Sequence, residues 1–141
     1  MTNGFLRQLF DTSVAAANPA LMLAGHLPTP PKGQTIVVGA GKAAASMARA
    51  VEDAWQGPLS GLVVTRYEHG LDCQHIEVIE AAHPVPDGQG RDAARRILAL
   101  LEELGPDDLA LCLISGGGSA LLSLPGVGLS LEDKQGLNSK L

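Results

Sequence analysis

Two glycine-rich segments, each directly after a short apolar run, constrain the fold of this 141-residue chain more than any other feature. Gly39-Ala40-Gly41-Lys42 follows residues 35–38, and Ser115-Gly116-Gly117-Gly118-Ser119 follows residues 109–114. Turns of this kind stand at the carboxyl ends of parallel strands, the edge of an α/β sheet where ligands usually bind. Glycine lets a backbone approach a ligand closely, and the N–H groups that open a helix attract negative charge. Each turn is expected at the point where a strand gives way to a helix. Together the two turns predict a site for a phosphate or a carboxylate.

Apolar periodicity along the rest of the chain alternates between the strand and the helix pattern. It predicts strands at residues 35–38, 61–65, 76–79 and 109–114, and helices around residues 5–14, 43–54 and 87–104, the last with Asp87 as its N-cap. Cys112 lies inside the last apolar run, so we expect it to be a buried small hydrophobe. This alternation favours an α/β fold, namely a Rossmann-like three-layer domain with a mainly parallel sheet.

The last residues predict a further helix. Ser130 and Asp133 have the spacing of a capping box, yet the chain reaches Leu141 without a terminating glycine or a later strand. We therefore expect the domain to be incomplete at its C-terminus and the chain to be part of a longer protein, with a short terminal helix as the alternative. In the first case Leu131 and Leu137 would have no partner.

The composition narrows the classes of partner. A formal net charge of −5 argues against nucleic acid, because phosphate backbones require a basic face. No apolar stretch has the length of a membrane span, and the first residues lack the pattern of a signal peptide, so the cytoplasm is the expected location. The two cysteines show no metal-ligand spacing.

The first glycine segment allows a nicotinamide cofactor but excludes a Walker A loop. Gly39, Gly41 and Ala44 fit the G-x-G-x-x-A variant of the dinucleotide fingerprint. A nicotinamide site should also carry an acidic residue near the end of the second strand, where this chain has Arg66 instead. An arginine there could accept the additional phosphate of NADP, so a reductase remains an alternative. Ile36 occupies the place of the first glycine of a Walker A loop.

Three side chains or segments near these turns can bind an anion, and each also has a purely structural explanation. Lys42 would stand at a helix start, where the macrodipole disfavours a cation by up to about 1 kcal/mol; a bound anion offsets that cost, but a solvated lysine also avoids much of it. The segment from Ser115 to Ser119 can form an anion-binding nest or only a tight turn. A nucleophilic Ser119 in a G-x-S-x-G turn would need a glycine two residues later, where this chain has Leu121. His83 can bind substrate, act as an acid or base, or only brace a loop with two prolines.

Together, segments 37–44, 64–67, 82–87 and 113–122 resemble the N-terminal part of the type II glycerate 2-kinase family. Members of this family are often labelled hydroxypyruvate reductase and carry a C-terminal domain called MOFRL. The resemblance implies that residues 1–141 are the N-terminal part of the glycerate kinase α/β domain, and that the MOFRL domain is absent from this chain.

The resemblance also implies an activity: phosphoryl transfer from ATP, with Mg²⁺, to D-glycerate, which gives 2-phosphoglycerate. Lys42 corresponds to the catalytic lysine of the family. The residues expected to bind substrate or phosphate are Gly39, Gly41, Ser115, Gly116, Gly117, Gly118, Ser119 and His83, and no metal ligand is assigned. An acidic base and an arginine would lie beyond Leu141, so the chain alone is expected to be inactive.

The expected partners are a small-molecule substrate and a nucleotide, without nucleic acid or membrane, and a homodimer is a further option. Two other functions remain open: an NADP-dependent hydroxypyruvate reductase and a non-catalytic module that binds a small anion.

Overall fold

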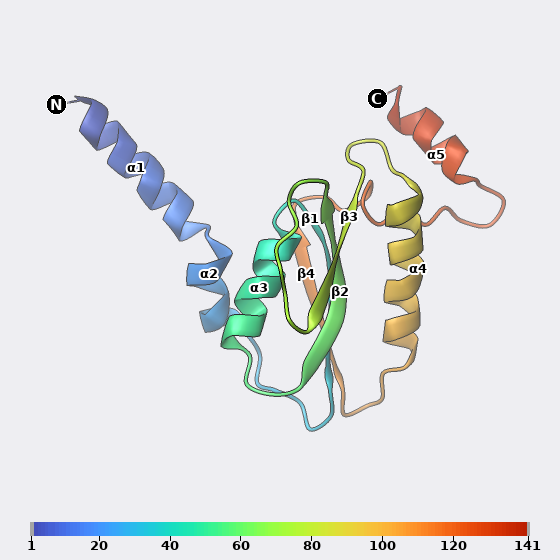
Figure 1. Cartoon of the computed structure of the whole chain (residues 1–141), viewed down its shortest axis with the longest axis horizontal. Helices are drawn as coiled ribbons and strands as arrows, with labels where there is room; N and C mark the ends of the chain where they lie inside the picture. Colours follow the sequence, from blue (N-terminus) through green and yellow to red (C-terminus); the bar gives the residue numbers. More distant parts are fainter. Residues whose placement is uncertain (1, 141) are drawn as a thin grey trace.

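The computed structural model describes residues 2–140, which form a four-stranded sheet with helices on both faces (Figure 1). The strands are β1 (Thr35–Gly41), β2 (Leu59–Arg66), β3 (Ile76–Ala81) and β4 (Leu109–Ser115), in the spatial order β3-β2-β1-β4. Each neighbouring pair is parallel. The predicted α/β fold with a parallel sheet is therefore confirmed, and the carboxyl ends of β1 and β4 lie at one edge.

The helices differ in their relation to the sheet, and two of them cover its two faces. They are α1 (Thr2–Ala16), α2 (Pro19–Met22), the 3₁₀ helix η1 (Leu23–His26), α3 (Ala44–Ala54), α4 (Gly88–Glu102) and α5 (Leu131–Asn138). Figure 1 shows α3 on one face and α4 on the other, which makes the three predicted layers. None of the helices among residues 2–140 is both long enough and apolar enough to cross a bilayer.

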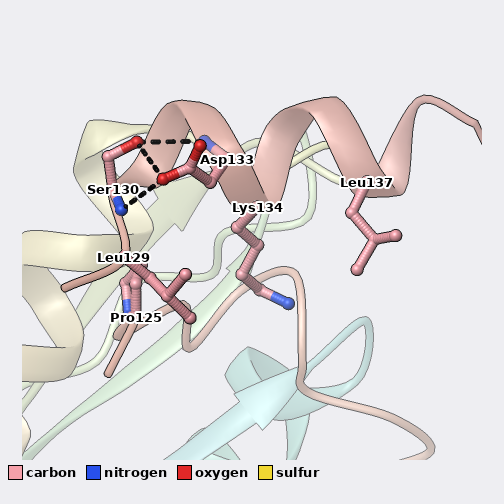
Figure 2. Close-up of a pocket in the computed structure, with 6 residues that line it drawn as sticks. All are labelled: Pro125, Leu129, Ser130, Asp133, Lys134 and Leu137. Carbon is pink, nitrogen blue, oxygen red and sulfur yellow. Dashed lines mark hydrogen bonds between the residues drawn. The ribbon is translucent and has the colours of Figure 1, made fainter. Parts of the chain in front are cut away.

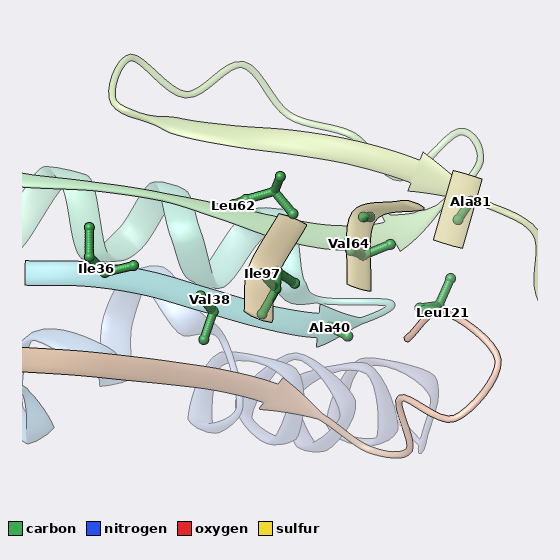
Figure 3. Packing of buried hydrophobic residues seen from close by; sticks show 9 residues of the cluster. Ile36, Val38, Ala40, Leu62, Val64, Ala81, Ile97 and Leu121 are labelled. Atoms are coloured by element: carbon green, nitrogen blue, oxygen red, sulfur yellow. The ribbon is translucent and has the colours of Figure 1, made fainter. Parts of the chain in front are cut away.

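Two apolar clusters, one on each face of the sheet, form the core. Successive side chains of a strand point to opposite faces, so Val38 packs toward α4 with Ile97 (Figure 3), whereas Val37 packs toward α3 with Val51. Full burial of such a side chain contributes about 1.5–3 kcal/mol. Packing on both faces of the sheet therefore fixes the orientation of β1, the central strand that leads to Lys42.

The edge strand β4 differs from the prediction. Ala110, Cys112 and Ile114 are exposed, so the expectation that Cys112 is buried is wrong. The physical reason is the position of α4, which packs mainly on β2 and β3 and leaves that face of β4 uncovered. A continuous apolar run predicts a strand but does not show which neighbours cover it.

The two terminal helices, α1 and α5, project away from the sheet (Figure 1). The first confirms the predicted helix, and its apolar residues are about half exposed or more: Phe5, Leu6, Leu9, Phe10 and Val14. In the last helix the predicted capping box is confirmed, because Ser130 Oγ accepts the Asp133 N–H at 3.0 Å and the Asp133 carboxylate accepts the Ser130 N–H at 2.9 Å. Leu137 is exposed, but Leu131 is buried, so the expectation that Leu131 has no partner is wrong.

Candidate functional site

The first glycine segment is strand and not turn. β1 continues through Gly41, and the turn consists of Lys42 and Ala43, so the predicted turn at Gly39 is wrong in its placement. A Cβ on Gly39 would collide with the carbonyl oxygen of Leu113, and Gly41 has a φ of +133° beside the carbonyl oxygen of Ser115. These glycines therefore let β1 lie close to β4. Whether Gly39 and Gly41 also bind a ligand stays a prediction.

The turn that carries Lys42 is held by side chains from β2, from the loop after β2 and from β4. Ser115 Oγ accepts a hydrogen bond from the Ala43 N–H at 2.9 Å. The Lys42 carbonyl oxygen lies 3.2 Å from His69 Nδ1 and accepts a long hydrogen bond of 3.5 Å from Thr65 Oγ1. The Lys42 side chain itself is exposed at the carboxyl edge. The backbone is thus fixed while the ammonium stays accessible.

The second glycine segment forms an open loop at the same edge. Gly116 has a φ of +71°, a conformation that favours glycine, and both Gly116 and Gly117 are exposed. A Cβ on either residue would meet no other atom within 4 Å. The loop therefore leaves free space in front of its backbone, as an anion-binding nest requires. Binding at Gly116, Gly117, Gly118 and Ser119 stays a prediction.

The helix predicted after this loop is reduced to one turn. The Leu122 N–H donates to the Gly118 carbonyl at 2.8 Å, but no helix continues from there. Ser123 Oγ donates to the carbonyls of residues 119 and 120, at 2.9 and 3.1 Å, so the side chain takes the place of helical N–H donors. Pro125 follows and has no N–H to extend a helix. Local side-chain bonding and a proline therefore end the helix early.

Leu121 attaches the glycine loop to the core. Its side chain is fully buried and packs in the cluster that includes Ala40, Val64 and Ala81, as Figure 3 shows. Its carbonyl oxygen lies against the first turn of α4, where a Cβ on Gly90 would approach it to 2.7 Å. The loop therefore combines an exposed part at Gly116 and Gly117 with a buried anchor at Leu121.

The turn after β2 contacts both the start of α4 and the turn that carries Lys42. The His69 N–H donates to the Arg66 carbonyl at 3.1 Å. Tyr67 Oη donates to Asp87 Oδ2 at 2.8 Å, and this hydrogen bond raises the pKa of the Tyr67 phenol above its ordinary value. Asp87 Oδ1 accepts the Gly90 N–H at 3.0 Å, which confirms Asp87 as the N-cap of α4. One short turn thus contacts the start of α4 through Tyr67 and the Lys42 backbone through His69.

His83 lies in the loop between β3 and α4, and its side chain is exposed. The loop includes a cis His83–Pro84 peptide and is held by α5, since Gln135 Nε2 donates to the Pro86 carbonyl at 2.8 Å and Asn138 Nδ2 donates to the Pro84 carbonyl at 3.2 Å. The two amide side chains give this loop a rigid support that the sequence did not indicate. A binding role for His83 stays a prediction.

A cavity of about 290 Å³ lies under α5. Figure 2 shows its lining residues, which are Pro125, Leu129, Ser130, Asp133, Lys134 and Leu137. Their walls are largely apolar, and Ser130 and Asp133 are already bonded to each other in the capping box. Neither Lys42 nor the glycine loop lines this cavity, so it is separate from the candidate site. Among residues 2–140, no group of three or more His, Cys, Asp or Glu side chains is placed to hold a metal ion.

A three-layer α/β domain with glycine-rich segments at the carboxyl edge of a parallel sheet is the architecture of many small-molecule-binding proteins. The family described as "Domain of unknown function (DUF4147)" matches residues 5–141, and this chain belongs to that family.

Named relatives confirm the resemblance drawn from the sequence. The chain is 50% identical over 137 residues to a protein of Agrobacterium vitis that carries the provisional name hydroxypyruvate reductase, a match that covers 96% of this chain and 31% of the relative. It is 46% identical over 102 residues to the glycerate 2-kinase of Pyrococcus horikoshii, covering 72% of this chain and 23% of the relative. The crystal structure of a glycerate kinase from Thermotoga maritima aligns with a TM-score of 0.81 at 36% identity, over 94% of this chain and 32% of that one. The chain thus spans about a third of the length of such relatives or less.

Proposed function

We propose that this chain is the N-terminal part of a glycerate 2-kinase, which transfers a phosphoryl group from ATP to D-glycerate and yields 2-phosphoglycerate. The observation that carries the proposal is the junction of Lys42 with the open glycine loop, joined by the Ser115–Ala43 hydrogen bond. The names of the relatives from Pyrococcus horikoshii and Thermotoga maritima support the choice of reaction.

The chemistry of the site suits phosphoryl transfer, in which positioning and charge neutralisation supply most of the catalysis. The Lys42 ammonium neutralises charge on the transferring phosphoryl group or holds the glycerate carboxylate. Backbone N–H groups of Gly116 and Gly117 hold the other anionic group in a fixed geometry. Ser115 Oγ already accepts the Ala43 N–H, so its own proton is available for a substrate oxygen.

The nucleotide and the metal differ in how well this chain accommodates them. A Cβ on Gly116 or Gly117 would meet no atom within 4 Å, so the loop leaves room for a phosphate group in front of its backbone. Residues 2–140 include no cluster of three metal-ligating side chains, so we assign no Mg²⁺ ligand to them and route no step through the metal. Mg²⁺ commonly binds through substrate phosphates and a few carboxylates, and it would accompany ATP.

The proposal extends to the rest of the enzyme. Residues 1–141 would form the first part of the α/β domain, with the general base, the phosphate-binding arginine and the MOFRL domain supplied from outside these residues. Both cysteines are free thiols, in keeping with a reducing compartment such as the cytoplasm. A homodimer is part of this proposal only as an option.

The second candidate is an NADP-dependent hydroxypyruvate reductase. It is favoured by Arg66 at the end of β2 and by the name of the relative from Agrobacterium vitis. Against it, Gly39 and Gly41 lie inside β1 and against β4, so the G-x-G pattern does not provide the open turn that a pyrophosphate needs. The kinase therefore fits the geometry better.

The deciding experiment uses the protein encoded by the complete reading frame that contains these residues. ADP release is measured by a coupled assay with and without D-glycerate, and NADPH is titrated while its fluorescence is followed. A kinase releases ADP only when D-glycerate is present and leaves NADPH fluorescence unchanged. Saturating NADPH binding without ADP release would replace the kinase by the reductase, and the absence of both would leave an anion-binding module.

A further inference from the structure

We propose that His69 is a positioning residue for Lys42: its ring donates a hydrogen bond that fixes the peptide group on which the Lys42 side chain depends. The inference deepens the proposed function, because it concerns how Lys42 is aimed at its anion. The sequence offered no signal for it, since His69 stands alone in a polar loop.

The geometry concerns a single peptide group, the one between Lys42 and Ala43. Its carbonyl oxygen lies 3.2 Å from His69 Nδ1, and its N–H donates to Ser115 Oγ at 2.9 Å. The first contact comes from the loop after β2 and the second from the end of β4, on either side of the central strand β1. A peptide group is planar, so contacts at both of its ends oppose its rotation. Because Lys42 Cα is bonded to this group, the direction of the side chain is restricted too.

The chemistry of the contact determines which nitrogen carries a proton. A carbonyl oxygen can only accept a hydrogen bond, so His69 Nδ1 must be the donor. In the neutral ring this tautomer leaves Nε2 without a proton. Thr65 Oγ1 also points at the same carbonyl, but its distance of 3.5 Å makes the shorter His69 contact the stronger restraint.

The turn that presents His69 is itself held in an unusual conformation. Glu68 has a φ of +67°, in the left-handed region that is unfavourable for a residue with a side chain. The turn is closed by the His69 N–H to Arg66 carbonyl bond, and its far side is fixed by Gly70, whose N–H donates to Glu80 Oε1 at 2.8 Å. Strained backbone persists where surrounding contacts determine it and often accompanies function. Here the strain accompanies the placement of the imidazole against Lys42.

Two substitutions of His69 separate its donor atom from its bulk. His69→Ala removes the donor, whereas His69→Asn keeps an N–H donor at the same number of bonds from Cβ as Nδ1. The matched control is His75→Asn. His75 is an exposed histidine of the same loop, and its hydrogen bond to Glu52 is donated by its backbone N–H. The His69 and His75 side chains are both exposed, so we expect each of the three variants to fold.

The first readout is independent of activity: the ¹⁵N chemical shift of the Ala43 amide in the 141-residue chain, which responds to hydrogen bonding at the Lys42 carbonyl. The second is kcat and KM for D-glycerate in the protein from the complete reading frame. We expect His69→Ala to move the Ala43 shift beyond the change seen in His75→Asn, and to lower kcat about tenfold or more with a smaller change in KM. His69→Asn should restore both.

An Ala43 shift that does not respond to His69→Ala would overturn the proposal, and so would a His69→Asn variant as impaired as His69→Ala. If the wild-type protein shows no D-glycerate-dependent ADP release, the proposed function fails, and the Ala43 shift still decides whether His69 holds the Lys42 peptide.

Discussion

Ser115 Oγ accepts the N–H of Ala43, the N-cap residue of α3, at 2.9 Å and from a distance of 72 residues in the sequence. The first N–H groups of a helix lack partners within the helix, and Ala43, the N-cap of α3, has no side chain that could accept one. The serine that ends β4 accepts the N–H of the N-cap residue itself and so holds the start of the helix. The two glycine-rich segments are therefore joined into one structural unit at the carboxyl edge.

We predict that Ser115→Ala lowers the free energy of unfolding by about 1 kcal/mol, the usual net contribution of one intramolecular hydrogen bond. Urea unfolding of the 141-residue chain provides the measurement. Ser119→Ala is the matched control, because that side chain is exposed at the other end of the glycine segment. Equal unfolding free energies for the two variants would mean that the Ser115 bond does not stabilise α3.

For Lys42 we predict a large loss of activity and a small change in stability. Losing a charge contact in a transition state can reduce kcat by about 10²–10³-fold, whereas an exposed lysine contributes little to folding. Lys32→Ala makes the same change of charge at the amino end of β1, the opposite edge of the sheet. The measurement is ADP release with D-glycerate at matched folded concentration. Equal kcat values for Lys42→Ala and Lys32→Ala would remove Lys42 from the mechanism.

The sequence predicted the fold because its strongest signals are local. Apolar runs followed by glycine, and helical stripes capped by Asp87 or Ser130, each depend on neighbours within a few residues. Burial depends on the placement of distant elements, which explains the failure at Cys112: the apolar run is a strand, but α4 does not extend over it.

The candidate site was predicted only in part, for the same reason. Lys42 and the segment from Ser115 to Ser119 were identified because glycine after a strand is a local pattern. Their connection through Ala43, and the contact of His69 with the Lys42 carbonyl, join residues that are far apart in the sequence. A single histidine in a polar loop has no periodicity or spacing that would reveal such a partner.

Leu121 gives a test of how the glycine loop is anchored. Replacing a fully buried leucine by alanine removes apolar contacts and leaves a cavity, so we predict that Leu121→Ala lowers the free energy of unfolding by about 2–5 kcal/mol. Leu124→Ala, at a leucine 40% exposed in the same segment, should cost much less. Thermal or urea unfolding measures both. Similar losses would place Leu121 outside the core.

The two thiols should differ in reactivity. Cys112 is exposed on β4, whereas Cys73 is partly covered, and burial raises the pKa of the Cys73 thiol. The thiolate is the reactive form, so a raised pKa and restricted access both slow alkylation. We predict that iodoacetamide modifies Cys112 first in the folded chain, as followed by peptide mass spectrometry, and that the difference disappears in urea. Faster modification of Cys73 would contradict the exposed position of Cys112.

Glu52 joins α3 to the start of β3, and its effect on stability should depend on pH. Its carboxylate accepts hydrogen bonds from the backbone N–H groups of residues 74–76 at 2.8, 2.6 and 2.7 Å. Burial alone would raise the pKa of Glu52, but the three donors outweigh it and lower the pKa below its ordinary value. Because the pKa of Glu52 is lowered in the folded state, its carboxylate stabilises the fold fully above the unfolded-state pKa of about 4.3. This stabilisation is lost as the pH falls through the folded-state pKa.

We therefore predict that Glu52→Gln lowers the free energy of unfolding by roughly 1–3 kcal/mol at neutral pH, since hydrogen bonds to a charged acceptor are stronger than those to an amide. The difference from the wild type should shrink in acid, where the wild-type carboxylate becomes protonated and its hydrogen bonds are no longer strengthened by a charge. Urea unfolding at several pH values between neutrality and strong acid measures this, with Glu102→Gln, at an exposed residue of α4, as the control for general charge effects. A Glu52→Gln difference that stays constant over this range would show that the charge of Glu52 does not hold the start of β3 in place.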